Sequence, residues 1–302
     1  MNNLVKGEQP DLKENSISSR LFDATNVVLL AIISLVMLVP FLYVVAVSFS
    51  SYKDFLESSF VLFPKEWVID SYQYIFSSSS FVRSIFVTIY ITVIGTLINL
   101  FFTATLAYVL SRPVVGQKTV LFAVLFTLLF SAGMIPTYLV VKETGLLNSF
   151  WALILPAAIS PFNLIVMRQF FLSIPSELNE AAVIDGANDL QTFIKIILPL
   201  SKPSMAAFGL FYAVAHWNNY FSGILYLNDP AKWPIQVILR QIVVVNEAQN
   251  SLGNPQVLME HAPPAETIQM AAIITATLPI LLVYPFLQKH FAKGVMLGSV
   301  KG

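Results

Sequence analysis

The sequence predicts an all-α membrane protein with six transmembrane helices. Hydrophobic residues make up 56% of the 302 residues and charged residues only 11%, whereas charged residues are about a quarter of a soluble domain. The charges leave long uncharged windows, each longer than the roughly 20 residues that a helix needs to cross the hydrocarbon core. Because these windows are too long and too non-alternating for barrel strands, helices are the form that satisfies the backbone in lipid. The uncharged windows are 24–52, 84–111, 119–141, 144–167, 203–228 and 267–288.

Each window predicts one span, and together the spans form one membrane domain over 24–290. The polar tail 1–23 carries both charge signs and ends without a small-residue cleavage site, which argues against a removed signal peptide. A second tail is expected at 291–302. The helices are expected near 24–49, 82–110, 118–140, 150–172, 202–227 and 267–290.

Lysine and arginine predict the orientation. With six spans both termini lie on one side of the membrane, and that side holds eleven of the 17 basic residues. The positive-inside rule puts this side, with the loops 111–118 and 173–201, in the cytoplasm. Two long loops, about 50–81 and 228–266, are then external. The second mixes aromatic residues and prolines with polar residues, which favours a docking surface for an outside partner over a solvated connector.

Several kinds of chemistry are excluded. The chain has no cysteine, which rules out disulfides and thiolate metal sites. It has no GxxxxGK[ST], HExxH or GxSxG motif, so no catalytic or metal site is predicted and energy-driven work would need nucleotide hydrolysis by another chain. A net charge of zero argues against a nucleic-acid partner. Apart from tyrosines, His216 is the one titratable group in the windows, and such a histidine is more often an interhelical hydrogen-bond partner than a proton relay.

Prolines and glycines interrupt the expected spans. Such breaks are tolerated where neighbouring groups satisfy the freed carbonyls. They suggest bent helices around a cavity, and ordinary membrane-helix usage explains them almost as well. The residues concerned are Gly133 and Pro136, Pro156 and Pro161, and Pro279 and Pro285.

The stretch 212–223, YAVAHWNNYFSG, places polar and aromatic residues close to one helical face. These groups are costly at membrane depth unless they face protein or water, so this face should line the bundle interior. Aromatic rings and amide donors suit a sugar, but polar groups that join helices, or an aromatic belt, explain the pattern about as well. The candidate substrate-pathway residues are Tyr212, His216, Trp217, Asn219 and Tyr220.

Four carboxylates crowd into a short stretch between two apolar runs. They are Glu177, Glu180, Asp185 and Asp189. The first two lie where the dipole of a helix capped by Ser176 favours negative charge. A net-negative helix is unsuited to anionic lipid. The stretch 176–190 is therefore predicted to be a short cytoplasmic helix that fills a groove on a partner protein.

One side of this expected helix is nearly bare. Ala181 and Ala182 are followed by Gly186, so another surface can approach the backbone closely. No nucleophile or metal ligand accompanies the acids, which makes a catalytic role unexpected.

The acidic stretch also begins a longer spaced pattern. From Glu180 to Pro199 the chain reads EAA, three residues, G, nine residues, I, one residue, LP. This pattern resembles the EAA loop of permease subunits in binding-protein-dependent ABC importers. The run 180–203 is similar to the maltose-permease-like carbohydrate branch. Four further stretches resemble its oligosaccharide and polysaccharide subgroup, the LplC- and YtcP-like permeases: 133–156, 167–171, 216–230 and 293–302.

This resemblance implies the MetI-like permease fold of a type I ABC importer, with a cytoplasmic coupling helix at about 176–190. It implies a non-catalytic subunit that moves oligosaccharides or polysaccharide-derived sugars by alternating access, with ATP and Mg on a partner ATPase and no cofactor on this chain. The implied partners are a second homologous permease, a cytoplasmic ATPase dimer and an extracellular or periplasmic solute-binding protein. The ending 293–302 resembles a flexible tail that reaches the ATPase dimer interface. The residues implied to couple to the ATPase are Glu180, Ala181, Ala182, Asp185, Gly186, Ala187 and Pro199.

Two other functions remain open from the residues alone. The first is a stand-alone channel or secondary carrier for a small polar solute, and the absence of carboxylates from the windows counts against it. The second is a membrane scaffold or assembly factor, which would show no sugar-dependent effect.

Overall fold

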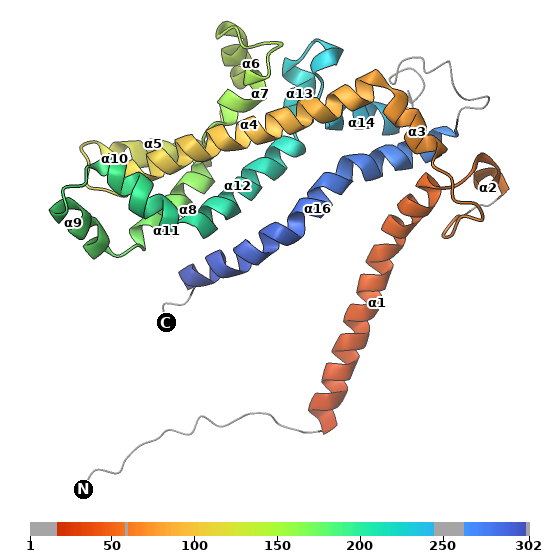
Figure 1. The fold of residues 1–302 in the computed structure, drawn as a ribbon, viewed down its shortest axis with the longest axis horizontal. Coiled ribbons are helices and arrows are strands. Elements are labelled where there is room, and N and C mark those ends of the chain that lie inside the picture. The colour runs from red at the N-terminus through yellow and green to blue at the C-terminus, as the bar shows by residue number, and fades with distance from the viewer. Residues whose placement is uncertain (1–16, 58–59, 245–262, 300–302) are drawn as a thin grey trace.

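A computed structural model describes residues 17–57, 60–244 and 263–299. In these ranges the regular structure is helical, apart from one isolated β-bridge between Ser50 and Trp67. The central helix α4 (Ser79–Leu110) runs along the molecule, and α12 (Lys202–Trp217) packs against both α4 and α16 (Ala265–Ser299) (Figure 1). Helix α1 (Ile17–Ser48) meets the bundle at its C-terminal end and projects away from it (Figure 1).

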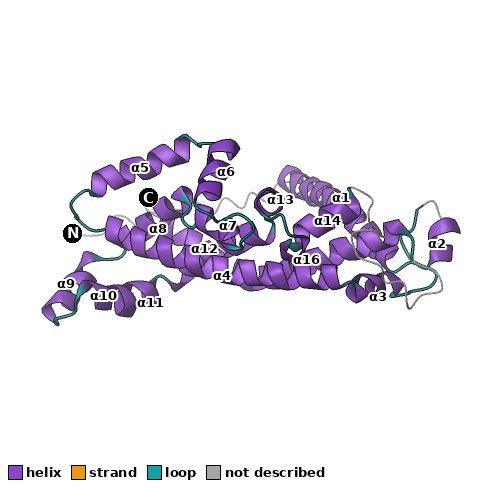
Figure 2. Ribbon diagram, turned by 90° about the horizontal axis from the view of Figure 1, so that it is seen from above, coloured by secondary structure: helices purple, strands orange, loops and turns teal. Residues whose placement is uncertain are grey.

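Shorter helices cover the two ends and one side of α4, as the view from above shows (Figure 2). They are α2 (Tyr52–Glu57), α3 (Asp70–Ser77), α5 (Gln117–Leu129), α6 (Met134–Glu143), α7 (Trp151–Ile154), the 3₁₀ turn η1 (Leu155–Ala157), α8 (Pro161–Leu172), α9 (Ser176–Ile184), α10 (Asp189–Thr192), the π-helical η2 (Phe193–Ile197), α11 (Leu198–Leu200), α13 (Phe221–Tyr226), the 3₁₀ turn η3 (Pro230–Lys232) and α14 (Ile235–Val243).

By length and composition, three described helices are able to cross a membrane, or five spans if each bent pair counts as one. The continuous ones are Ser19–Ser48, Ser79–Leu110 and Ala265–Val283. The bent pairs are α7 and η1 with α8, at 52°, and α10, η2 and α11 with α12, at 82°. The span expected at 118–140 is divided, because α5 ends after 13 residues and Gly133, at φ 84°, precedes α6.

The break before α8 is stabilised by side chains from other helices. Pro161 has no N–H, so the Ala157 carbonyl four residues earlier lacks its helical partner. Asn99 of α4 supplies one, because its Nδ2 donates to this carbonyl at 2.9 Å. On the other side of the break, the Ser160 N–H donates to the Tyr212 hydroxyl at 3.1 Å. The expected break at this proline is therefore confirmed, and it ties α8 to α4 and α12.

The other expected breaks differ from one another. An open hollow of about 400 Å³ lies between α6 and η1, lined in part by Pro136 and Pro156. In contrast, α16 continues as one helix through Pro279 and Pro285. Of the two explanations for these prolines, the continuous helix favours ordinary membrane-helix usage over a break.

Two segments expected to be irregular are also helical. Within the loop 228–266, which was expected to be external, α14 buries Ile235, Ile238 and Ile242 beside α16. Residues 245–262 of that loop lie outside the described chain. Helix α16 continues to Ser299, so most of the ending 293–302, which was expected to be flexible, is helix. Residues 300–302 lie outside the description. The apolar face of α14 explains the first difference, because that face needs a core to pack against.

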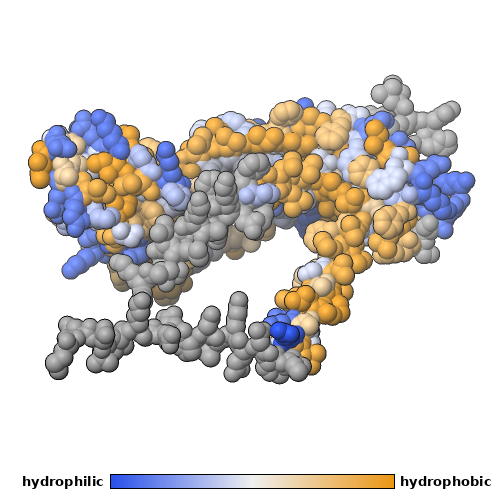
Figure 3. All heavy atoms as spheres, turned by 60° about the horizontal axis from the view of Figure 1, so that its bottom comes forward, coloured by the Kyte–Doolittle hydropathy of each residue, from blue (hydrophilic) through white to orange (hydrophobic). Residues whose placement is uncertain are grey.

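Much of the surface is apolar. None of the 18-residue membrane window within Ser19–Ser48 is buried, and orange hydrophobic residues cover much of the face shown in Figure 3. Surface of this extent belongs against lipid or another membrane subunit.

The contact between α4 and α12 depends on Gly95. A methyl group at this position would lie 2.5 Å from His216 Nε2 and 2.7 Å from its Cε1, and His216 is only 4% exposed. We expect Gly95→Ala to reduce the free energy of unfolding by about 1–3 kcal/mol through overpacking, measured as a lower melting temperature in detergent. Gly209→Ala is the matched control, because its nearest atom is the flexible Leu100 Cδ1 at 3.3 Å. Equal melting temperatures for the two variants would contradict this prediction.

Candidate functional site

The acidic stretch lies at one end of the bundle, beyond the C-terminal end of α4 (Figure 1). It forms two short helices, α9 and α10, with a turn over 185–188 between them. The single helix expected over 176–190 was therefore wrong.

Gly186 ends α9. Its φ of +79° is the left-handed conformation, which glycine adopts without the steric penalty of a Cβ. The Gly186 N–H donates to Val183 O at 3.0 Å and the Ala187 N–H to Ala182 O at 2.9 Å, which satisfies carbonyls at the helix end. Among described residues, no atom lies within 4 Å of an added Cβ here. The left-handed turn therefore explains why a glycine occupies position 186. The expectation that Gly186 lies within a helix and leaves one helical face without side chains does not explain it.

The start of α9 also differs from the expectation. Ser176 is the first helical residue, and the N-cap position is Pro175, which makes no side-chain cap. A side-chain cap occurs instead at α10, where Asn188 Oδ1 accepts the Gln191 N–H at 2.8 Å and Gln191 Oε1 accepts the Asn188 N–H at 3.0 Å. The spacing N-x-x-Q was the signal in the sequence that could have located this helix start.

The exposed residues of α9 and the turn after it are only partly those that the sequence predicted. Ala182 is 5% exposed and therefore faces the protein's own interior, which contradicts its expected place on a docking face. Val183 and Ile184, which the sequence reasoning missed, are 62% and 86% exposed. Pro199 lies further along, in α11 at the bend before α12. The expected coupling residues that are exposed are Glu180, Ala181, Asp185, Gly186 and Pro199, and Ala187 is half-buried.

Arg112, just after α4, contacts both short helices. Its Nη1 lies 2.8 Å from Asp189 Oδ1, and its Nη2 donates to Asn179 Oδ1 at 3.1 Å. Its guanidinium lies 4.6 Å from the centroid of the Tyr108 ring, and the Tyr108 hydroxyl donates to the backbone carbonyl of Asp189 at 3.1 Å. We call Arg112, Tyr108, Asn179 and Asp189 the Arg112 cluster. No local sequence pattern indicated it, because its members lie up to 81 residues apart.

The carboxylates of this segment do not converge on one point. Within the described ranges, no three His, Asp or Glu side chains come together in a way that could hold a metal ion. An exposed apolar pair beside Glu180 and Asp185, on a helix held at the end of the bundle, is suited to docking against another protein.

The polar face expected on 212–223 is mostly used for packing. The Tyr212 hydroxyl lies 2.7 Å from Thr103 Oγ1, and Trp217 Nε1 donates to Ala276 O at 3.0 Å. His216 is buried over Gly95. These three residues join α12 to α4 and α16, which favours the helix-joining explanation for them.

The residues between α12 and α13, which the sequence placed on the same helical face, are not helical. Helix α12 ends at Trp217 and α13 begins at Phe221, so the expected helical spacing does not reach Asn219 and Tyr220. Both are partly exposed. Asn219 Oδ1 accepts the Ser222 N–H at 3.2 Å, and Arg240 lies over the Tyr220 ring at 4.9 Å.

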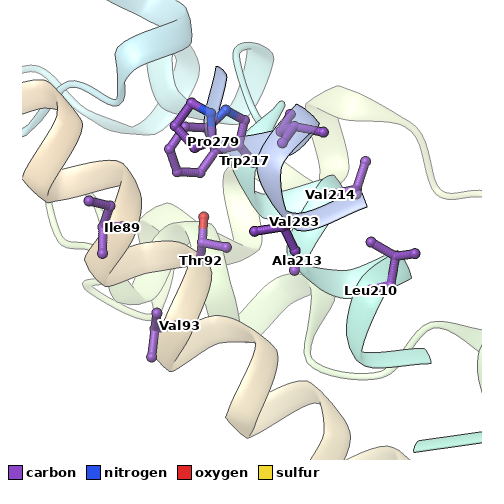
Figure 4. A pocket seen from close by; sticks show the side chains of 10 residues that line it. Ile89, Thr92, Val93, Leu210, Ala213, Val214, Trp217, Pro279 and Val283 are labelled. Atoms are coloured by element: carbon purple, nitrogen blue, oxygen red, sulfur yellow. The ribbon is translucent and has the colours of Figure 1, made fainter. Parts of the chain in front are cut away.

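Beside Trp217 an apolar groove of about 160 Å³ lies between α4, α12 and α16 (Figure 4). Apart from the Thr92 hydroxyl and the Trp217 ring, aliphatic side chains and Pro279 line it. A sugar requires several converging polar groups, so this groove does not fit a sugar.

Comparison with known proteins identifies the family to which the chain belongs. The profile described as "Binding-protein-dependent transport system inner membrane component" matches residues 110–297. Protein LplC of Bacillus subtilis (strain 168) is 50% identical over 289 residues, which is 95% of this chain and 97% of that protein. The polygalacturonan/rhamnogalacturonan transport system permease protein YtcP of the same strain is 51% identical over 288 residues, 95% of this chain and 100% of that protein.

One solved structure is similar over nearly its whole length. It is a chain of a bacterial ABC transporter involved in the import of the acidic polysaccharide alginate. The two chains are 35% identical, with a TM-score of 0.84, and the similarity covers 91% of this chain and 98% of that chain.

The turn at Gly186 yields a structural prediction. Gly186→Ala should strain the left-handed backbone by about 1–2 kcal/mol, and Gly186→Asn should strain it less because asparagine tolerates this conformation. Hydrogen exchange of the amides at 185–187 should therefore be fastest in the alanine variant, intermediate in the asparagine variant and slowest in the wild type. Equal exchange in all three proteins would show that the turn does not require glycine.

Proposed function

The chain belongs to the family of binding-protein-dependent transport system inner membrane components, and from this we propose that it is one half of a heterodimeric permease that imports oligosaccharides by alternating access. It is a non-catalytic permease subunit of an ABC transporter and a multi-pass protein of the cell membrane, and it carries no cofactor. The observation that carries the proposal is the nearly full-length similarity to a polysaccharide-system permease, in a chain whose EAA stretch forms an exposed helix.

In the proposed topology the chain crosses the membrane six times within 24–290, and both tails are cytoplasmic. The spans are α1, α4, α5 with α6, α7 with α8, α12 with α13, and α16. The third is interrupted at 130–133, and such interruptions are tolerated where the segment lies against protein or a cavity. The hollow beside α6 supports this placement. The excess of basic residues on the side of α9 supports the orientation.

In the proposed coupling, α9 docks in a cleft of a cytoplasmic ATPase that holds ATP and Mg. Val183 and Ile184 would supply the apolar contact, and Glu180 and Asp185 the polar rim. Exposed aliphatic side chains of this size are unfavourable in water unless a partner covers them. The proposal thus keeps α9 as the coupling helix but replaces Ala182 and the bare glycine side with this apolar pair.

The proposed substrate pathway includes fewer residues than the sequence predicted. We retain Asn219 and Tyr220, which are both partly exposed. Tyr220 also lies next to Arg240. Tyr212, His216 and Trp217 act as packing residues beside the pathway. The proposed external partner is a solute-binding protein, which would dock near the loop 228–266.

An oligosaccharide is the proposed substrate class. The YtcP relative serves a polygalacturonan/rhamnogalacturonan system, and the similar solved transporter imports the acidic polysaccharide alginate. Both polymers contain carboxylated sugars, so short chains of sugar acids are the first compounds to test. A stand-alone channel or carrier does not fit a family that works with a separate binding protein.

Reconstitution tests the function directly. We expect the tagged chain, expressed with its neighbouring transporter genes, to purify with a second permease and an ATPase dimer. In vesicles, this complex should take up galacturonate oligosaccharides only with ATP and the binding protein present. Uptake by this chain alone, without an ATPase, would contradict the proposal and favour a channel or carrier.

The docking face makes a separate prediction. Ile184→Asp should weaken retention of the ATPase by about tenfold or more, because a charge would replace a desolvated apolar contact. Retention is measured as the ATPase-to-permease ratio after purification at increasing dilution. Val115→Asp is the matched control, because Val115 is also fully exposed and precedes α5 on the same side. Equal retention in both variants would contradict the assignment of Ile184.

A further inference from the structure

The turn between α9 and α10 is bridged by one side chain. Arg112 donates to Asn179 of α9 and pairs with Asp189 of α10, at 3.1 and 2.8 Å. Gly186 lies between these two contacts in sequence. The left-handed turn is the covalent connection between the two helices. Arg112 adds a non-covalent connection that helps to fix the angle between them.

Arg112 is itself held in place. Its guanidinium lies over the Tyr108 ring at 4.6 Å, and Tyr108 is buried and tilted against Phe193 of η2 with ring centroids 4.7 Å apart. The Tyr108 hydroxyl donates to the Asp189 carbonyl at 3.1 Å. Tyr108 and Arg112 thus contact the segment at side-chain and backbone atoms at once, which restricts rotation of α10 about the end of α4.

The end of α4 is equally well defined. The Leu110 carbonyl accepts Arg168 Nε at 2.6 Å and Gln117 Nε2 at 2.7 Å. Cationic and amide donors at a helix C-terminus satisfy its free carbonyls and its dipole. From this end α4 continues unbroken to Ser79. On that distant part of α4, Thr88 accepts the N–H of Ile235 in α14 at 2.7 Å.

The ion pair adds little to folding stability. The Asp189 side chain is 80% exposed and that of Arg112 25%, and an exposed pair contributes only about 0–1 kcal/mol. Its geometry is more informative, because the planar guanidinium fixes two partners on different helices at once. The Arg112 contacts therefore add little to the free energy of unfolding, but they fix the position of α9 and α10 relative to the end of α4. Contacts of this kind are suited to transmitting a displacement of α9 to α4.

We propose that Arg112 is a positioning residue for energy coupling: it fixes α9 to the end of α4, so that a displacement of α9 moves α4 and is not absorbed by the Gly186 turn. This inference rests on the proposed function, in which an ATPase moves α9. Through the contact between Thr88 and Ile235, the displacement would reach the external side of the bundle.

The first test removes the guanidinium. In the reconstituted complex with its ATPase and binding protein, Arg112→Met should keep the ATPase bound and hydrolysing ATP, while galacturonate oligosaccharide imported per ATP falls about fivefold or more. Arg112→Lys should give an intermediate ratio, because an ammonium lacks the fork that reaches both partners. The matched control is Lys118→Met, which removes an exposed charge close by on the same side. An unchanged ratio in Arg112→Met, or loss of the ATPase from that complex, would overturn the proposal.

The second test restores the connection by other means. The chain has no cysteine, so Arg112→Cys with Asn179→Cys can be bridged by a bifunctional thiosulfonate linker in a complex whose other subunits lack reactive thiols. The open double variant should import little sugar per ATP, and the bridged one should recover. Failure of the bridge to restore coupling would overturn the proposal. Failure of the wild-type complex to import sugar would instead overturn the proposed function, so the two failures are distinguishable.

Discussion

In a membrane, a backbone group that loses its helical partner must find another within the protein, because hydrocarbon supplies none. This constraint favours helices in the uncharged windows and also explains how the interruption at Pro161 is built. At Pro161 the freed Ala157 carbonyl accepts Asn99 Nδ2, and the neighbouring Ser160 N–H donates to Tyr212. The broken span thereby becomes attached to α4 and α12. The same bonds that satisfy the backbone therefore help to hold α8 against α4 and α12.

This use of polar side chains limits what a polar helix face means for function. Tyr212, His216 and Trp217 have the residue types of a sugar site, but they are buried against neighbouring helices. Asn219 and Tyr220 follow the end of α12, where the chain is no longer helical and the side chains are partly exposed. The end of α12 therefore leaves Asn219 and Tyr220 partly exposed, whereas the helical residues before them are packed against neighbouring helices.

At the end of the bundle that we propose to be cytoplasmic, the chain combines the proposed docking helix α9 with a defined attachment to α4. Helix α9 exposes Val183 and Ile184 between carboxylates, and the Arg112 cluster ties both α9 and α10 to the end of α4. Such an arrangement suits a subunit that uses ATP hydrolysed on another chain. In the proposed function, α9 contacts the partner, whereas Arg112 and Tyr108 connect α9 and α10 to the membrane helix α4.

The sequence alone determined the helical membrane class, because charges are excluded from windows long enough to cross the bilayer, and it determined the family, because the spacing from Glu180 to Pro199 is local. It also located the break at Pro161, but α16 continues through Pro279 and Pro285, so a missing N–H does not by itself decide where a helix breaks. Only the tertiary structure decided that Ala182 faces inward, that Gly186 ends a helix and that α14 packs into the core. Only the tertiary structure brought Arg112 to Asn179 and Asp189, because contacts between residues 67 and 77 positions apart depend on how α4, α9 and α10 pack together.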